Sequence, residues 1–327
     1  MPQSNIKPSQ SMIRLQTTAM TLMLLSLMAC TGNKGGAASG AEGDDESATV
    51  QIDTTATVLK FESVELADSS SYKAKIQADS NEGDGSGYRI GKMTCDYTVH
   101  TLQAVAGPAE VVKFINQWLT IDAAEESVEA PVTVEKVANK YAELKAEGVT
   151  DVRSAFKIKG GGCRMLGNIH LDDQDEDDIV WPFESGDSYY KEVNVQKCTK
   201  GLLVIRIGGS EYAACGVHPM PFGYATTFDL KHLRQLTLDD IIKPESQPVV
   251  LKMIRKDLIG QGYGEEMNEE IDFPSDGATL TDEGVDFAYG AYEIGPYAMG
   301  MPSVTFSYKQ MQPYFTALIK ELMEESN

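Results

Sequence analysis

Alternating apolar and polar positions predict strands in the first part of the patterned chain, and apolar positions three and four residues apart then predict helices. The strands are expected at residues 57–66, 71–78, 94–105 and 155–159. The helices are expected at residues 108–119 and 131–147. Tyr97 and Val99 should point inward from their strand, and the helical stripes that contain Trp118 and Tyr141 should pack in a core.

The second half of the chain shows the same mixture of patterns. Strands are expected at residues 189–196, 202–207, 226–230, 285–289 and 304–308. Helices are expected at residues 248–259 and 313–325, and a hairpin connection at 279–284. The continuous apolar run at 202–207 should be a central strand paired with 189–196. Clusters of strands with one or two helices each predict an α+β fold, built from two packed subdomains of mainly antiparallel sheet.

The N-terminal residues are interpreted as a targeting segment. Residues 1–29 should be a signal peptide, because Lys7 and Arg14 precede an apolar run too short to span a bilayer comfortably. The true start is Met1 or Met12, since the second gives a more usual short basic region. After this segment, two domains are expected at residues 50–188 and 189–327.

A lipid anchor is expected at Cys30. The sequence Leu27-Met28-Ala29-Cys30 resembles the bacterial lipobox, which implies cleavage before Cys30 and a diacylglyceryl group on its sulfur. Residues 30–49 are mostly small or acidic, so they should form a flexible lipidated tether. Thr31 after the cysteine implies, by the lipoprotein sorting pattern, the outer membrane. The periplasmic and the surface-exposed side both remain open.

The charge of the chain limits its partners. The formal net charge is −21, and the hydrophobic content of 42% is that of a globular protein. No basic patch is available to release counterions from phosphates, so no nucleic acid is expected as a partner. The membrane should be reached only through the lipid anchor. A basic protein would be attracted, although acidity also serves solubility alone.

Cysteines and acidic residues give no metal site. Four cysteines follow Cys30, at Cys95, Cys163, Cys198 and Cys215. Their spacing does not fit zinc, and they are either disulfide-bonded, with three full pairings open, or small buried apolar residues. The acidic run at 172–178 matches part of an EF-hand loop but lacks its glycine, so a solvated loop is expected. No metal and no cofactor are therefore expected.

The usual signatures of hydrolases are missing. The histidines are His100, His170, His218 and His232, and the chain contains no HExxH, HxxxH or GxSxG motif. We therefore expect no catalytic residues, and we expect that the protein is not an enzyme. A glycan-acting hydrolase that uses two paired carboxylates stays open as the alternative.

Candidate binding residues gather around the segment from Tyr289 to Gly300, which is apolar, aromatic and glycine-rich and carries one charge, Glu293. Glu293 should either fix the loop by accepting backbone N–H groups or face a partner. Tyr292 and Tyr297 should either pack in the core or form an exposed platform.

His218, in a glycine-rich turn before Pro219, is the fourth candidate, as a turn residue or a ligand contact. A fixed structural corner is the favoured interpretation of the whole segment. Gly295, Pro296 and Gly300 should then set its backbone geometry.

A family resemblance rests on five short sequences that occur in order. They are residues 212–218, 227–230, 236–241, 280–287 and 292–298. The series resembles the extracytoplasmic domain of the RsiV anti-sigma factors, and a related domain accompanies PdaC-type peptidoglycan deacetylases. The resemblance covers about residues 189–315, and residues 58–180 are more weakly similar to the partner domain that usually precedes it. Ala213, Ala214 and Cys215 depart from the family's Thr-Gly-Gly.

This resemblance implies an α+β fold with two packed parts and binding rather than catalysis, because RsiV proteins recognise lysozyme. The chain shows no cytoplasmic sigma-binding segment, no transmembrane helix and no deacetylase domain, so those activities are not expected. We expect a non-enzymatic envelope lipoprotein that recognises a basic protein such as lysozyme, or a cell-wall glycan such as a peptidoglycan fragment. A structural envelope lipoprotein is a further alternative.

Overall fold

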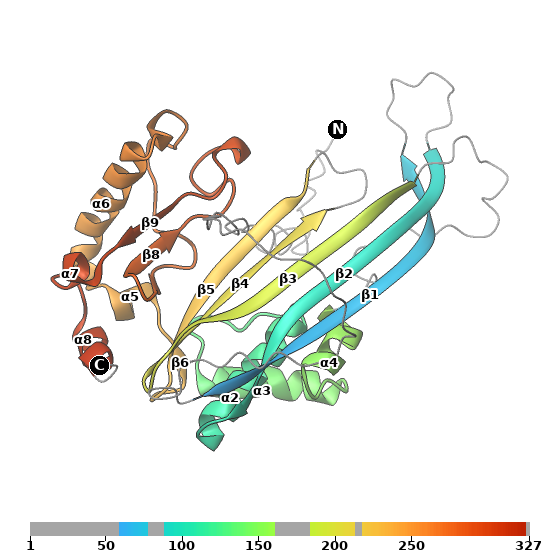
Figure 1. Ribbon diagram of the computed structural model, residues 1–327, viewed down its shortest axis with the longest axis horizontal. Helices are drawn as coiled ribbons and strands as arrows, with labels where there is room; N and C mark the ends of the chain where they lie inside the picture. The colour runs from blue at the N-terminus through green and yellow to red at the C-terminus, as the bar shows by residue number, and fades with distance from the viewer. Residues whose placement is uncertain (1–58, 78–87, 161–183, 213–217, 325–327) are drawn as a thin grey trace, which may run out of the picture.

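The computed structural model describes residues 59–77, 88–160, 184–212 and 218–324, which form two sheets with helices around them (Figure 1). The larger sheet contains β1 (Lys60–Gln77), β2 (Tyr88–Ala106), β3 (Glu184–Cys198), β4 (Leu202–Tyr212), β5 (Met220–Asp229) and β6 (Arg234–Gln235), in that spatial order. Neighbouring strands are antiparallel except β2 and β3, which are parallel. The predicted α+β class is confirmed.

Strand β1 corrects one prediction. The separate strands predicted at residues 57–66 and 71–78 are one long strand, which pairs with β2 along its length. Three serines at residues 69–71 interrupt the apolar alternation, but a backbone ladder does not depend on apolar side chains. The Ser69 hydroxyl even donates to the Asp96 carboxylate of β2 at 2.8 Å.

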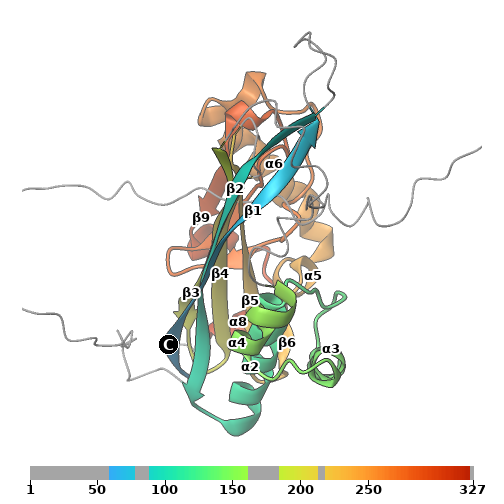
Figure 2. The ribbon, with the colours of Figure 1, turned by 90° about the vertical axis from the view of Figure 1, so that its right-hand side faces the viewer.

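Three helices lie on one side of this sheet (Figure 2). They are α2 (Ala109–Ala123), α3 (Val134–Ala146) and α4 (Val152–Ala155). The α2 side chains Phe114, Ile115 and Trp118 are buried, and the Trp118 ring centroid lies 5.0 Å from that of Phe228 on β5. Burial of side chains of this size stabilises a fold by about 1.5–3 kcal/mol each. The core role predicted for Trp118 is confirmed.

Residues 155–159 were predicted as a strand, and this prediction is wrong. Helix α4 continues there into a π-helix, Phe156–Gly160. Asp151 and Ser154 form a capping box, in which the Asp151 carboxylate accepts the Ser154 N–H at 2.8 Å. This cap begins a helical turn that buries Phe156, and the two effects outweigh the weak strand preference of a five-residue run.

Strand β4 is central, as predicted, and its two faces serve two hydrophobic cores. Leu203 and Ile205 belong to the core under α2, whereas Leu202 and Val204 belong to the core of the C-terminal part. Successive side chains of a strand point to opposite faces, so one short apolar run can line both cores. Residue 189, the predicted domain boundary, lies inside β3, and the sheet is continuous through it.

The C-terminal part forms the second core. Its antiparallel sheet contains β7 (Thr279–Leu280), β8 (Val285–Ala288) and β9 (Ser303–Phe306). Its helices are α5 (Leu238–Ile241), α6 (Gln247–Gly260), α7 (Tyr308–Met311) and α8 (Ala317–Glu324), with short 3-10 helices η3 (Pro244–Ser246), η4 (Tyr263–Glu265) and η5 (Tyr297–Met299). The closing helix begins later than predicted, because Phe315 forms a β-bridge with Ile242.

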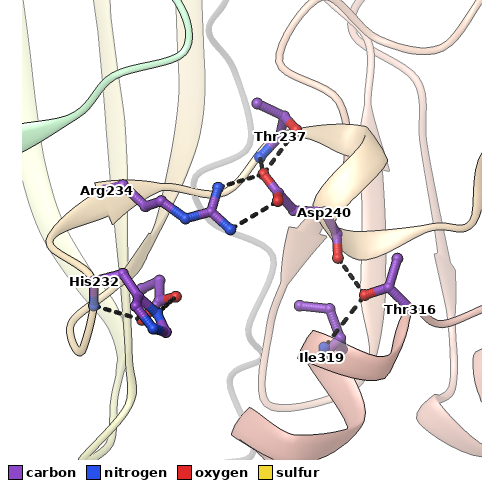
Figure 3. A network of polar contacts seen from close by, with 7 residues as sticks. His232, Arg234, Thr237, Asp240, Thr316 and Ile319 are labelled. Carbon is purple, nitrogen blue, oxygen red and sulfur yellow. Dashed lines mark hydrogen bonds and ion pairs between the residues drawn. The ribbon is translucent and has the colours of Figure 1, made fainter.

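Arg234 and Asp240 connect the larger sheet to the C-terminal part (Figure 3). Two guanidinium nitrogens of Arg234 on β6 each donate to an Asp240 oxygen at 2.8 Å. Asp240 also accepts the Thr237 N–H and hydroxyl at the start of α5. Burial alone would raise the pKa of Asp240, but the hydrogen bonds from Arg234 and Thr237 outweigh it and lower that pKa. Within the described part of the chain, no helix has the length and apolar character needed to cross a bilayer.

Candidate functional site

The segment from Tyr289 to Gly300 forms a fixed corner between β8 and β9. Tyr289 is fully buried, and its hydroxyl donates to the Asp272 carbonyl at 2.8 Å. Gly300 has φ +67, a conformation that favours glycine. A Cβ on Gly295 would lie 2.2 Å from the Met299 sulfur. The segment therefore has the fixed backbone geometry that the sequence predicted.

Glu293 holds this corner to a neighbouring loop. Its Oε2 accepts the Gly290 N–H and its Oε1 accepts the Ser275 N–H, both at 2.6 Å. Hydrogen bonds to an ionised carboxylate are short and roughly twice as strong as neutral ones. Of the two roles weighed for Glu293, the loop-fixing one is therefore the one that its geometry shows.

The other three candidates come together at the surface. The His218 and Tyr297 rings are stacked, with centroids 3.9 Å apart, and the Tyr292 ring centroid lies 5.5 Å from that of Tyr297. The Tyr297 hydroxyl donates to the Pro219 carbonyl at 2.8 Å, which ties the corner to the start of β5. We call Tyr292, Tyr297 and His218 the aromatic surface. Tyr292 is 47% exposed, so this ring at least is outside the core.

A further carboxylate lies close to Glu293. Asp276 follows Ser275, whose N–H Glu293 accepts, in the turn that the Gly277 N–H closes on the Pro274 carbonyl. The Asp276 residue is exposed, yet partial desolvation by the protein around it, followed by the charge of Glu293, raises its pKa to about 7. The aromatic surface therefore has a neighbouring group whose charge changes near neutral pH.

A second group of polar and charged residues is buried or half-buried, and the sequence alone did not predict it. Asp122 and Glu125 at the end of α2, Tyr189 and Lys191 on β3, and Tyr224 on β5 form what we call the buried cluster. The Lys191 side chain is only 2% exposed, and its ammonium lies 3.0 Å from Asp122 Oδ1 and 3.2 Å from Glu125 Oε1. The available sequence signal is Lys191 itself, a charge at an inward position of a predicted strand.

Of the remaining cysteines, histidines and acidic residues discussed from the sequence, the structure describes some and not others. Cys95 is buried and disulfide-bonded, so at least one disulfide forms. The His232 ring nitrogen lies 2.6 Å from the buried Asp229 carboxylate. Cys30, Cys163, Cys215, His170 and the acidic run at 172–178 lie outside the described residues. Among the residues that are described, no three His, Cys, Asp or Glu side chains are grouped to hold a metal ion.

Comparison with known proteins finds one matching family and solved structures with a similar fold. Residues 239–309, which include the corner with Tyr292, Glu293 and Tyr297, match the family "Protein of unknown function (DUF3298)". No curated protein matches the chain.

Two solved structures of DUF3298 proteins are similar to this chain. One, from Bacteroides fragilis NCTC 9343, has a TM-score of 0.52 and 21% sequence identity, and the match covers 82% of this chain and 99% of that one. The other, from Pseudomonas aeruginosa PAO1, has a TM-score of 0.41 and 14% identity, covering 79% and 96%. At this level of identity, the Bacteroides structure supports the fold alone.

Proposed function

We propose that this protein is a non-enzymatic, extracytoplasmic binding lipoprotein that recognises a basic protein such as lysozyme through the aromatic surface. The observation that carries the proposal is the meeting of Tyr292, Tyr297 and His218 from two distant segments, with Tyr292 exposed. A stack that spans two segments and is fixed by Glu293 is preorganised, which lowers the cost of ordering on binding. The RsiV-like resemblance of the sequence supports the same partner.

The chemistry of the surface suits a cationic partner. Exposed tyrosine faces attract arginine and lysine side chains, each contact contributing about 0.5–1 kcal/mol at an exposed site. Glu293 and Asp276 place negative charge beside these rings. The net charge of −21 would also accelerate the encounter with a basic protein.

Titration calorimetry of the full chain with lysozyme tests this function. Binding is expected at low salt and should weaken as salt is added, since exposed charges are screened. Peptidoglycan fragments serve as the comparison ligand, and salt-independent binding of these fragments in place of lysozyme would transfer the proposal to a glycan. Absence of lysozyme binding at low salt would contradict the protein-partner proposal.

A glycan-acting hydrolase is a second candidate, which the nearness of Asp276 to the Glu293 carboxylate favours. Asp276 has a pKa of about 7 and lies beside the carboxylate of Glu293. A general acid in a glycan hydrolase also has a raised pKa and lies near a second carboxylate. Both Glu293 oxygens accept backbone N–H groups, which leaves that residue less suited to catalysis. Release of soluble fragments from peptidoglycan by the wild type, lost in Asp276→Asn, would establish this second function instead.

The envelope location belongs to the same proposal. Cys30 and the apolar run before it support lipid attachment, and Thr31 supports the outer membrane. Metabolic labelling of cells with palmitate should label the wild-type chain and leave Cys30→Ser unlabelled. Equal labelling of the two chains would contradict the lipid anchor.

A further inference from the structure

The buried cluster joins the end of α2 to the larger sheet through one ammonium. Lys191 donates to the Asp122 backbone carbonyl, at the end of α2, at 3.0 Å. The same ammonium bonds Asp122 Oδ1 and Glu125 Oε1, so it serves both carboxylates. Helix C-termini carry partial negative charge, which favours a cation at this place. Lys191 therefore stays charged, and its two carboxylate partners must share it.

The hydrogen bonds of the cluster leave one buried carboxylate oxygen without a donor. Tyr224 donates to Asp122 Oδ1 at 2.8 Å, and Tyr189 donates to Glu125 Oε1 at 2.9 Å. Asp122 Oδ2 is buried and has no hydrogen-bond partner among the described residues. A buried ionised carboxylate oxygen without a donor is costly. None of the donors of the cluster, Lys191, Tyr189 and Tyr224, bonds to this oxygen.

Its surroundings add further negative charge. The titratable groups that interact with Glu125 from the sheet are Tyr97 on β2, Tyr189 and Lys191 on β3, Glu211 on β4 and Tyr224 on β5, and Asp187 on β3 interacts in turn with Glu211. Burial raises the pKa of Glu125, and Asp122 adds to this, while Lys191 opposes it. Burial and the same carboxylates raise the pKa of Tyr189 and Tyr224 as well, so both stay neutral donors.

We propose that Asp122 and Glu125, which both bond the one ammonium of Lys191, form a binding site for one proton, and that the folded protein keeps this proton above the pH at which a glutamate normally ionises. With that proton bound, the pair and Lys191 together carry no net charge, and one carboxyl O–H is available as an additional donor in the cluster. Loss of the proton leaves two negative charges for one ammonium. The attachment of α2 to the sheet is then a pH-sensitive contact, tight when protonated and weaker when deprotonated.

The sign of the effect follows from linkage. The folded state binds this proton more strongly than the unfolded chain does. Folding stability therefore falls as pH rises from the usual pKa of a glutamate through the raised pKa of the folded pair. A Glu125→Gln substitution mimics the protonated residue, since its carbonyl oxygen can still accept from Tyr189 and Lys191. This variant should lose the part of the pH dependence that the pair contributes, while the part contributed by Asp276 remains.

Thermal unfolding of the full chain between about pH 5 and about pH 8 tests the proposal. The midpoint of the wild type should fall by roughly 3 °C relative to Glu125→Gln as the pH rises across this range. Glu129→Gln removes an exposed acid just beyond the cluster and is the matched control. Its curve should run parallel to that of the wild type. Parallel curves for the wild type and Glu125→Gln would overturn the proposal.

Infrared spectroscopy gives a readout that does not depend on stability. The wild type should show the C=O stretch of a protonated, buried carboxyl at a pH where glutamates are normally ionised. Asp276, with a pKa of about 7, adds a band of its own near neutral pH, so the variants are made in an Asp276→Asn chain. Relative to that chain the band should be missing from Glu125→Gln and also from Asp122→Asn, because either substitution leaves one carboxylate for the Lys191 ammonium. Absence of the band from the wild type, a measurement that needs no variant to fold, would overturn the proposal.

Discussion

The aromatic surface and the buried cluster contain the same kinds of residue but have different roles. Each combines tyrosines with carboxylates. In the buried cluster the tyrosine hydroxyls donate to the carboxylates, and these contacts are partly buried. At the aromatic surface the carboxylate of Glu293 accepts backbone N–H groups, and the tyrosine rings beside it are left with an open side, Tyr292 most of all.

The difference teaches that the partner of each carboxylate decides the role of the tyrosines near it. Where the carboxylate is buried with an ammonium, the tyrosines complete a polar network that anchors a helix. Where backbone N–H groups satisfy the carboxylate, the tyrosine rings are held in place but stay available for a binding partner. Substitutions in the two regions should therefore separate stability from binding.

The largest effect is expected from Lys191→Met. Removal of the ammonium leaves Asp122 and Glu125 buried without their cation, and breaking a buried pair in this way costs about 3–5 kcal/mol of unfolding free energy. The loss should shrink as the pH is lowered, because protonation removes the uncompensated charge. Denaturant unfolding measures it. The exposed Lys113→Met is the control, with less than about 0.5 kcal/mol expected, and an equal effect of both substitutions would contradict the anchoring role.

Glu293→Gln should have the next largest effect. The amide replaces one acceptor oxygen by a donor that faces a backbone N–H, so one hydrogen bond is lost and stability should fall by about 2 kcal/mol. Lysozyme affinity should fall with it, since Tyr292 and Tyr297 lose their fixed corner. Denaturant unfolding and calorimetry together measure the two effects. A stable variant with normal affinity would show that Glu293 does not hold the corner.

Tyr292→Gly should affect binding alone. Tyr292 has φ +67, which glycine adopts readily, so the variant should unfold at the same or a higher denaturant concentration. Loss of the exposed ring should weaken lysozyme binding about tenfold, or about 1.4 kcal/mol. Tyr190→Ala, which removes another partly exposed ring on β3, should leave the affinity unchanged. Equal losses in both variants would indicate a non-specific effect.

Asp276→Asn should give the smallest effect, visible only as a change in pH dependence. The pKa of about 7 means that Asp276 gains its negative charge as the pH rises through neutrality. Affinity of the wild type for lysozyme should therefore increase about threefold from pH 6 to pH 8, as a neighbouring exposed charge would produce, and the variant should lose this increase. Wild-type stability should decrease over the same range, because a raised carboxyl pKa favours the protonated folded state.

The fold could largely be predicted from the sequence, because periodicity reports local structure directly. The apolar stripe that contains Trp118 predicted helix α2. The apolar run at residues 202–207 predicted strand β4 and its central position in the sheet. The strand predicted at 155–159 failed because a cap at Asp151, and not the apolar pattern, decided that turn.

The candidate site was predicted only in part. Short motifs identified Tyr292, Glu293, Tyr297 and His218, but the stacking of His218 on Tyr297 depends on tertiary structure. The buried cluster draws its members from α2, β3 and β5, so no local pattern connects them. Lys191 at an inward strand position was its one visible sign.

Hydroxyl-radical footprinting of the full chain with and without lysozyme tests the central claim most directly. Lysozyme is expected to protect Tyr292 and Tyr297 from modification. Tyr190, which is 37% exposed on β3, should be modified equally in both samples. A complex that forms while Tyr292 stays as reactive as in the unbound protein would show that the aromatic surface is not the binding surface.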